Sequence, residues 1–327
     1  MSDSVIKYAA LPLPLACQPA RARIMCAIEN CGEQITRSRQ AERLIVLPEY
    51  VLTGYPEGES TAEWQAKACI REDGPEYEAL GKLAQQHGIY LSGNTYEVDA
   101  NFPELYFQTS FIISDSGNVI LRYRRLISMT APTPHDVLDS YLDIYGSDSL
   151  FPVVDTELGR LACVASEEIL YPEITRAHAL RGAEVICHSN SEIEIKESTP
   201  GYNARQVRAY ENMVFIVSAS SAVTRAESHS EVVDYSGSIS TLAGHHETRG
   251  GDAEIDISAL RRARVKTSMT NTLARLRLGV FRHAYDTDPV YPKNTLISAL
   301  GVKTPSQNHY LDTQQSVIDS LIERGII

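Results

Sequence analysis

The stretch that decides the fold is LACVASEEILYPEITRAHALRGAEVI, residues 161–186. Residues 161–165 are an unbroken apolar run, which is typical of a buried strand. A polar turn follows and closes at Pro172, a residue that favours the start of a helix. Residues 183–186 are mostly apolar again, so the stretch predicts a strand, a helix and a second strand. Ser166 lies in the turn after the first strand, where many enzymes place a nucleophile.

Apolar runs and helical patterns alternate along the rest of the chain. Further strands are predicted at residues 5–13, 43–49, 89–98, 105–114, 117–126, 214–223, 236–244 and 253–258. Further helices are predicted at residues 21–41, 74–88 and 202–213. Buried strands with helices between them favour sheets that are covered on at least one face. The prediction is an α/β fold with one domain over residues 1–285 and a C-terminal extension over residues 286–327.

The composition is that of a globular protein with an acidic surface. The chain has 327 residues, of which 43% are hydrophobic and 22% charged, and its formal net charge is −12. The arginines are scattered, so this balance disfavours nucleic acids and anionic membranes as partners. No apolar run approaches the ~20 residues that span a bilayer, and residues 1–16 lack the basic start of a signal peptide. The six cysteines form no C-x-x-C pair, so we expect a cytoplasmic protein with free thiols and no metal or cofactor.

Three predicted strands end in a residue that can carry chemistry. They are Glu49 in LIVLPEYVLTGYP (44–56), Arg125 in GNVILRYRRL (117–126) and Ser166 in the opening stretch. In open α/β folds, sites form beyond the carboxyl ends of strands. We therefore expect these three side chains to meet in one pocket.

These stretches resemble the carbon–nitrogen hydrolases of the nitrilase superfamily. In chain order they resemble the blocks that hold the family's catalytic glutamate, lysine and cysteine. RAYENMVFIVSAS (208–220), YSGSISTLAG (235–244) and AEIDISALRRAR (253–264) resemble three structural blocks of the same family. The resemblance covers about residues 5–290. It implies a four-layer α-β-β-α sandwich, a homodimer or larger homo-oligomer, and a Glu-Lys-Cys site for amides or nitriles.

Two of the three catalytic positions depart from the family pattern. The family's cysteine lies six residues before the proline of a Pro-Glu pair, and here Ser166 has that position. The family's lysine follows Tyr-Arg, and here Arg125 takes its place. Only Glu49 matches. Cys163 does not supply the missing thiol, because strand residues three apart face opposite sides and its apolar neighbours favour a core thiol.

The two replacements change what the site can do. A serine hydroxyl needs a well-placed base, for which Glu49 is the candidate. Arg125 cannot give up a proton as a lysine can, and it favours the charged, less basic form of a neighbouring carboxylate. It can still hold an oxyanion or a carboxylate by hydrogen bonds. Both changes point away from efficient thiol-type hydrolysis and toward binding of a planar or anionic group.

Five further residues are candidate substrate contacts: Tyr55, Asp136, Glu167, Asn190 and Glu192. For Glu167 and its neighbour Glu168, the other interpretation is solvent exposure or capping of the helix that begins near Pro172. Asp136 lies where many members of the resembled family carry a second pocket glutamate. Residues 187–192 follow a strand whose end forms part of the family's pocket, and a solvated loop is the alternative there.

Two functions fit these observations. In the first, the chain hydrolyses a small amide, carbamoyl compound or nitrile, with Glu49 as general base, Ser166 as nucleophile or water-positioning group and Arg125 as oxyanion or carboxylate clamp. In the second, it is a non-hydrolytic homologue that binds a small ligand through the same pocket, mainly by Arg125. The C-terminal extension ends in an apolar helical stripe, which packs either on its own domain or on a second subunit.

Overall fold

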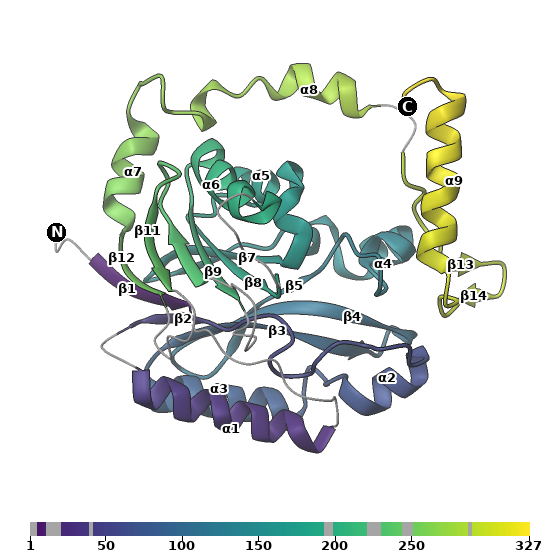
Figure 1. The fold of residues 1–327 in the computed structure, drawn as a ribbon, viewed down its shortest axis with the longest axis horizontal. Helices are drawn as coiled ribbons and strands as arrows, with labels where there is room; N and C mark the ends of the chain where they lie inside the picture. The colour runs from purple at the N-terminus through teal and green to yellow at the C-terminus, as the bar shows by residue number, and fades with distance from the viewer. Residues whose placement is uncertain are drawn as a thin grey trace.

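Two six-stranded sheets pack face to face, and helices cover the outer face of each, which gives four layers (Figure 1). The computed structural model describes residues 5–10, 21–38, 42–192, 199–220, 230–243, 251–286 and 290–327. The predicted α-β-β-α sandwich is confirmed.

The first sheet has the strand order β12-β1-β2-β3-β4-β5, and β2 is parallel to both of its neighbours. Its strands are β1 (Val5–Ala10), β2 (Leu44–Val46), β3 (Tyr90–Asp99), β4 (Phe102–Ile113), β5 (Val119–Arg124) and β12 (Gly251–Asp256). Helices α1 (Arg21–Ser38) and α3 (Pro75–His87) lie on its outer face, below the sheet in Figure 1. Their apolar stripes bury residues such as Ile28 and Leu80 against strand residues such as Phe111.

The second sheet has the order β11-β10-β9-β8-β7-β6, and β7, β8 and β9 are parallel. Its strands are β6 (Val154–Thr156), β7 (Gly159–Ala165), β8 (Val185–Asn190), β9 (Phe215–Ser220), β10 (Ser230–Val233) and β11 (Ile239–Ala243). Helices α5 (Pro172–Leu180) and α6 (Pro200–Asn212) cover its outer face. The opening stretch thus forms β7, α5 and β8 as predicted, and the carboxyl ends of the parallel strands meet at one edge.

The inner faces of both sheets form one apolar layer. Tyr8, Val46 and Leu161 are fully buried in it, and so is Cys163. Burial raises the pKa of the Cys163 thiol well above its usual range. The prediction that Cys163 is a core thiol is confirmed. The described cysteines are free thiols, and Cys17 lies outside the described residues.

The predicted elements are confirmed with shifts of a few residues at their ends, wherever the described residues allow the comparison. The predictions for residues 5–13, 21–41, 214–223 and 236–244 each extend beyond the described residues. The sequence patterns missed the strands β6, β10, β13 (Ile297–Ser298) and β14 (Gly301–Val302). They also missed four helices: α2 (Thr61–Ala68), α4 (Leu138–Tyr145), α7 (Ile257–Val265) and α8 (Leu278–Tyr285). These helices have eight or nine residues, too few turns for a clear apolar period.

The C-terminal residues 290–327 contain a short hairpin of β13 (Ile297–Ser298) and β14 (Gly301–Val302), followed by α9 (His309–Glu323). Leu296 is buried with residues of β4 and α4 in a separate apolar cluster, so the part of this segment around the hairpin packs on its own chain. Ile322 of α9 is 56% exposed, and packing of the α9 stripe on its own domain or on a second subunit stays a prediction. The predicted C-terminal helix is confirmed, whereas the domain boundary at residue 285 stays a prediction. Within the described ranges, no helix has both the length and the apolar character needed to cross a membrane.

Gly81 in α3 offers a test of the helix packing. A Cβ atom on Gly81 would lie 2.4 Å from the carbonyl oxygen of Gly117, in the turn between β4 and β5. We predict that Gly81→Ala lowers the free energy of unfolding by about 1–3 kcal/mol through overpacking, as measured by urea denaturation. Gly279→Ala in α8 is the control, because nothing lies within 4 Å of its added Cβ. If Gly81→Ala and Gly279→Ala were both as stable as the parent chain, this would contradict the close approach of Gly81 to Gly117.

Candidate active site

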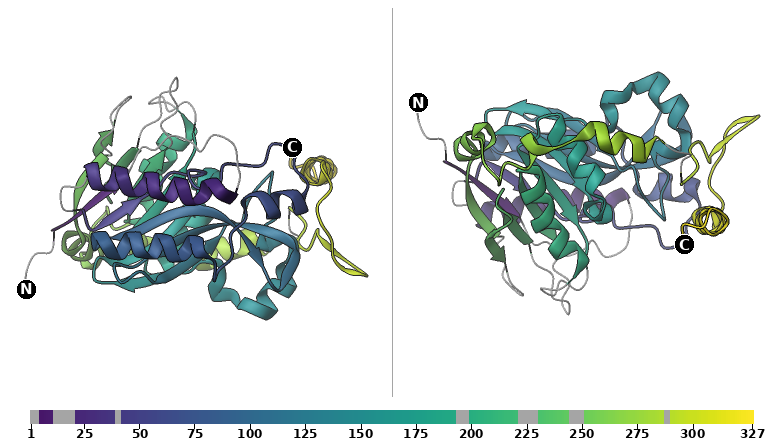
Figure 2. Two further views of the ribbon diagram at one scale, coloured as in Figure 1. Left: turned by 90° about the horizontal axis from the view of Figure 1, so that it is seen from below. Right: turned by 90° about the horizontal axis from the view of Figure 1, so that it is seen from above.

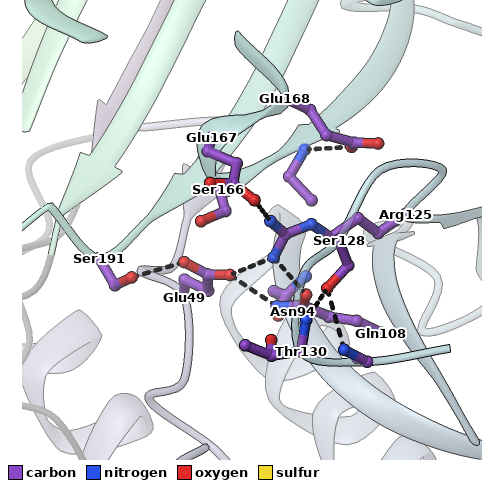
Figure 3. A network of polar contacts seen from close by, with 12 residues as sticks. Glu49, Asn94, Gln108, Arg125, Ser128, Thr130, Ser166, Glu167, Glu168 and Ser191 are labelled. Carbon is purple, nitrogen blue, oxygen red and sulfur yellow. Dashed lines mark hydrogen bonds and ion pairs between the residues drawn. The ribbon is translucent and has the colours of Figure 1, made fainter. Parts of the chain in front are cut away.

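Glu49, Arg125 and Ser166 come together at the carboxyl ends of strands from both sheets (Figure 3). Glu49 comes shortly after β2, and Arg125 and Ser166 directly follow β5 and β7. Glu49 is fully buried, Arg125 is 5% exposed and Ser166 is half-buried. The structure therefore brings together the three residues that the sequence singled out.

The Glu49 carboxylate is fixed by neutral donors on both of its oxygens. Gln108 Nε2 donates to Oε1 at 2.6 Å, and Ser191 Oγ donates to Oε2 at 2.7 Å. The backbone N–H of Glu49 donates to the carbonyl of Asn190 at 3.2 Å, which joins the end of β2 to the end of β8. The carboxylate is therefore held in one orientation inside the site.

Arg125 is bound on three sides. Its Nε donates to the carbonyl of Ile127 at 2.6 Å, and Nη1 donates to Gln108 Oε1 at 2.8 Å and lies 3.7 Å from Glu49 Oε1. Nη2 donates to Glu167 Oε1 at 2.5 Å. A guanidinium has two N–H groups on Nη2, so one remains without a partner among the described residues. Burial favours a lower pKa for Arg125, but the surrounding carboxylates, Glu49 first, raise it above its usual value.

Ser166 lies at a strained turn. Its φ of 51° is in the left-handed region that non-glycine residues rarely adopt. His188 Nε2 donates to the Ser166 carbonyl at 2.8 Å, and His188 Nδ1 accepts from Ser218 Oγ at 2.9 Å. Asn190 Nδ2 donates to the same Ser218 oxygen at 2.7 Å. Burial lowers the pKa of His188 to about 3, so a neutral imidazole holds the turn.

His188 and Ser218 were missed in the sequence because CHSNSE was assigned to the segment after a strand. The structure places residues 187–190 inside β8, fully buried, so the solvated-loop interpretation is wrong for them. Two polar side chains at alternate positions of a central strand, His188 and Asn190, were the available signal.

Glu168 ties the Ser166 turn to the Arg125 segment. Its buried carboxylate accepts from the backbone N–H groups of Leu126 at 2.7 Å, Ile127 at 3.1 Å and Ala165 at 3.3 Å. Tyr123 Oη donates to it at 2.8 Å. The prediction that Glu168 faces solvent or caps the helix near residue 172 is wrong, because its carboxylate is directed into the interior. Burial raises its pKa to about 7, although Arg125, Tyr123 and the N–H groups of Leu126 and Ile127 act in the opposite direction.

Glu167 supplies a second carboxylate to Arg125. Its side chain is 46% exposed, so the expected solvent exposure is half right, but one oxygen is bound to Arg125 Nη2. Asp136, the other candidate for a second pocket carboxylate, is occupied elsewhere. Its Oδ2 accepts from the backbone and side chain of Thr133, and its Oδ1 accepts from Thr295 at 2.6 Å. These bonds favour a structural role for Asp136, and its predicted substrate contact stays untested.

The remaining candidates lie at the edge of the site. The Tyr55 ring is 46% exposed and lies 5.5 Å from the ring of Tyr50, which follows Glu49. The Asn190 side chain is directed at Ser218. Glu192 accepts from Arg205 Nη1 at 2.8 Å, and substrate contacts by all three candidates stay predictions.

A cavity of about 540 Å³ lies elsewhere, beside the β3–β4 hairpin, and includes none of the three central residues. Its acidic residues are already paired, for example Asp99 with Arg124 and Tyr145, which favours a structural interpretation. Within the described part of the chain, no group of three or more His, Cys, Asp or Glu side chains could hold a metal ion.

Comparison with known proteins agrees with this geometry. The family model for carbon–nitrogen hydrolases matches residues 14–265, so the chain belongs to the carbon–nitrogen hydrolase family, a group within the nitrilase superfamily that the sequence resembled.

Individual relatives are distant. A formamidase of Pseudomonas syringae pv. tomato is 27% identical over 72% of this chain and 67% of its own length. Nitrilase homolog 2 of Dictyostelium discoideum is 24% identical over 80% of this chain and 78% of its own. A solved Saccharomyces cerevisiae member of branch 10 of the nitrilase superfamily has a TM-score of 0.64, with 22% identity over 83% of this chain and 97% of its own. This structural likeness supports the fold.

The raised pKa of Glu168 predicts a pH-dependent stability. An acid whose pKa rises from 4.5 to about 7 on folding stabilises the fold fully below pH 4.5, and this contribution is lost as the pH rises through 7. In the parent chain, this effect lowers the free energy of unfolding by about 3 kcal/mol as the pH rises between these two values. We predict that Glu168→Gln lacks this decrease, because glutamine does not titrate. Urea denaturation at pH 5 and pH 8 measures the difference between variant and parent.

The difference between the two proteins is informative because the buried histidines act with the opposite sign. His188 and His178 have pKa values lowered to about 3, so they add stability as the pH rises through 6.5 in both proteins. Glu72→Gln is the control, since Glu72 is exposed and pairs with Arg122. A parent chain and Glu168→Gln variant with the same pH slope would contradict a shifted Glu168.

Proposed function

We propose that the chain hydrolyses a carbon–nitrogen bond of a small amide, carbamoyl compound or nitrile. The observation that carries the proposal is a buried carboxylate, Glu49, fixed beside a serine in a strained turn and a guanidinium with one N–H to spare. Membership of the carbon–nitrogen hydrolase family and relatives named as a formamidase and a nitrilase homolog support it.

For an amide, the proposed reaction has two halves. Glu49 accepts the proton of the Ser166 hydroxyl as Oγ attacks the carbonyl carbon, and the protonated Glu49 then gives that proton to the departing nitrogen. Water attacks the resulting acyl-serine, again losing a proton to Glu49, and the acid leaves as Ser166 regains its proton. In a variant of this scheme, Glu49 activates water directly and Ser166 only positions it.

Arg125 has an electrostatic role in this proposal. It cannot relay a proton, because a guanidinium stays charged. Its free Nη2 N–H suits a single oxyanion that develops beside Ser166. The oxygen atoms of Ile127, Gln108 and Glu167 already accept hydrogen bonds from Arg125. No pair of parallel N–H groups is therefore left for a substrate carboxylate, and the oxyanion role is favoured over the carboxylate clamp.

One observation favours the alternative, a non-hydrolytic homologue that binds a small ligand. Within the described residues, the Ser166 hydroxyl makes no hydrogen bond, so the apo site lacks a preformed contact from nucleophile to base. Catalytic contacts often tighten only when substrate is bound, and the hydrolase therefore stays our first proposal.

Ammonia release separates the two functions. We predict that the chain releases ammonia from a member of a panel of small amides, carbamoyl amines and nitriles. Glu49→Gln should reduce the rate by at least about 100-fold, the usual contribution of a general base. Ser166→Cys should keep activity, since a thiolate is the stronger nucleophile. Silence of both the parent chain and Ser166→Cys, with a ligand still bound, would favour the non-hydrolytic function.

We also propose that the chain forms a homodimer through the layer of α5, α6 and α8. Helix α8 lies across α5 and α6, and Tyr285 Oη donates to Glu173 of α5 at 2.7 Å (Figure 2). Val280 and Phe281 on α8 and Val207 on α6 are exposed, and exposed apolar side chains on the helices of one layer favour a partner surface.

Light scattering after gel filtration tests this surface. We predict the mass of a dimer for the parent chain and a shift toward monomer for Val280→Asp, because a buried unpaired charge opposes association. Lys82→Asp on α3, at the opposite layer, is the control and should stay dimeric. A monomeric parent chain at all concentrations would contradict the proposal.

A further inference from the structure

The described charged groups around the site carry a net negative charge. Two guanidinium groups there are each bound by two carboxylates: Arg125 by Glu49 and Glu167, and Arg205 by Glu192 and Glu231. Glu192 belongs to the site because it directly follows Ser191, which donates to Glu49, and its backbone N–H donates to Asn190 Oδ1. These described groups leave two negative charges in excess, and Glu168 adds to them when it is ionised.

An anionic ligand therefore meets an unfavourable site. Each guanidinium is already paired with two carboxylates, so neither offers an uncompensated positive charge to such a ligand. A substrate carboxylate could reach Arg125 only by displacing Glu167, and it would then add to the negative excess.

The Glu167 carboxylate indicates that the preferred ligand carries a positive charge. Only Oε1 is bonded, to Arg125 Nη2, while Oε2 makes no hydrogen bond within the described residues. The side chain is 46% exposed, whereas Glu49 and Arg125 beneath it are buried. Figure 3 shows Glu167 next to Ser166, so a ligand bound at the serine would have the half-exposed Glu167 carboxylate as a neighbour.

Resting on the proposed function, we propose that the site selects amides or carbamoyl compounds that carry a positively charged amino group. The Glu167 carboxylate accepts the ammonium through Oε2, while the carbonyl faces Ser166 and the free N–H of Arg125. Glu167 is then the residue that sets specificity for charge. Because it also pairs with Arg125, it prevents a substrate carboxylate from binding this guanidinium, whose free N–H can then bind the oxyanion.

Binding of three ligands of similar shape tests the inference. β-Alaninamide is a cation, butyramide replaces its ammonium by a methyl group, and succinamate replaces it by a carboxylate. Dissociation constants would be measured by ligand-observed NMR on Ser166→Ala, which keeps every charge of the site. We predict that β-alaninamide binds about two- to fivefold more tightly than butyramide, the effect expected of one partly exposed ion pair, and that succinamate binds most weakly.

Two further variants in the same background identify the residue. Glu167→Gln should abolish the preference for β-alaninamide and strengthen succinamate, because it removes one negative charge and frees Arg125 Nη2. Glu72→Gln is the matched control, since Glu72 is also a carboxylate paired with an arginine of the β5 region, Arg122, and it should leave the order unchanged. Tighter binding of succinamate than of β-alaninamide, or an unchanged order in Glu167→Gln, would overturn the inference.

Ammonia release from the same three compounds by the parent chain separates this inference from the proposed function. Preferential binding of β-alaninamide that Glu167→Gln abolishes would uphold the charge selectivity even if no ammonia is released. Release from butyramide or succinamate without a preference for the cation would uphold the hydrolase and overturn the selectivity.

Discussion

The site depends on the Arg125 guanidinium, which lies between two carboxylates that come from different sheets. Glu49 follows β2 of the first sheet and Glu167 follows β7 of the second, and Arg125 itself follows β5. A buried charge is costly unless it is paired and hydrogen-bonded, so the buried Glu49 and Arg125 stabilise each other's placement. Gln108 connects them further, because it donates to the carboxylate and accepts from the guanidinium.

The side chains of His188 and Glu168 position the backbone around the Glu49–Arg125 pair. His188 holds the carbonyl of Ser166 from β8, and Glu168 holds the N–H groups of Leu126 and Ile127 just beyond Arg125. The side chain of Ser166 is thereby presented by a turn that is strained and yet bonded on both sides. This arrangement is what a nucleophile needs, since its position is set by the scaffold and not by the hydroxyl's own hydrogen bonds.

Much of the fold could be predicted because its patterns are local. Long apolar runs gave β7 and β8, and Pro75 and Gly88 marked the two ends of α3. The alternation of strand faces also placed Cys163 in the core. The helices α2, α4, α7 and α8 were missed because each is too short for a clear period.

The centre of the site could be predicted as well, because strand ends carry Glu49, Arg125 and Ser166. The residues that surround these three could not be predicted, since a sequence does not show whether a carboxylate after a strand is directed outward or into the protein. Glu167 and Glu168 are adjacent and identical in type, yet one is half-exposed on Arg125 and the other is fully buried. His188 was missed for the same reason, because its partners come from the turn after β7 and from β9.

We propose that Ser166 attacks the substrate with Glu49 as its base, and this step leaves an acyl group on Ser166 that can be trapped. The chain would be mixed with p-nitrophenyl acetate, quenched in acid and mapped by peptide mass spectrometry. We expect an acetyl group on Ser166 that is absent from Ser166→Ala and strongly reduced in Glu49→Gln. Acetylation of Ser166 no greater than that of other surface hydroxyls, or equal labelling in Glu49→Gln, would contradict it.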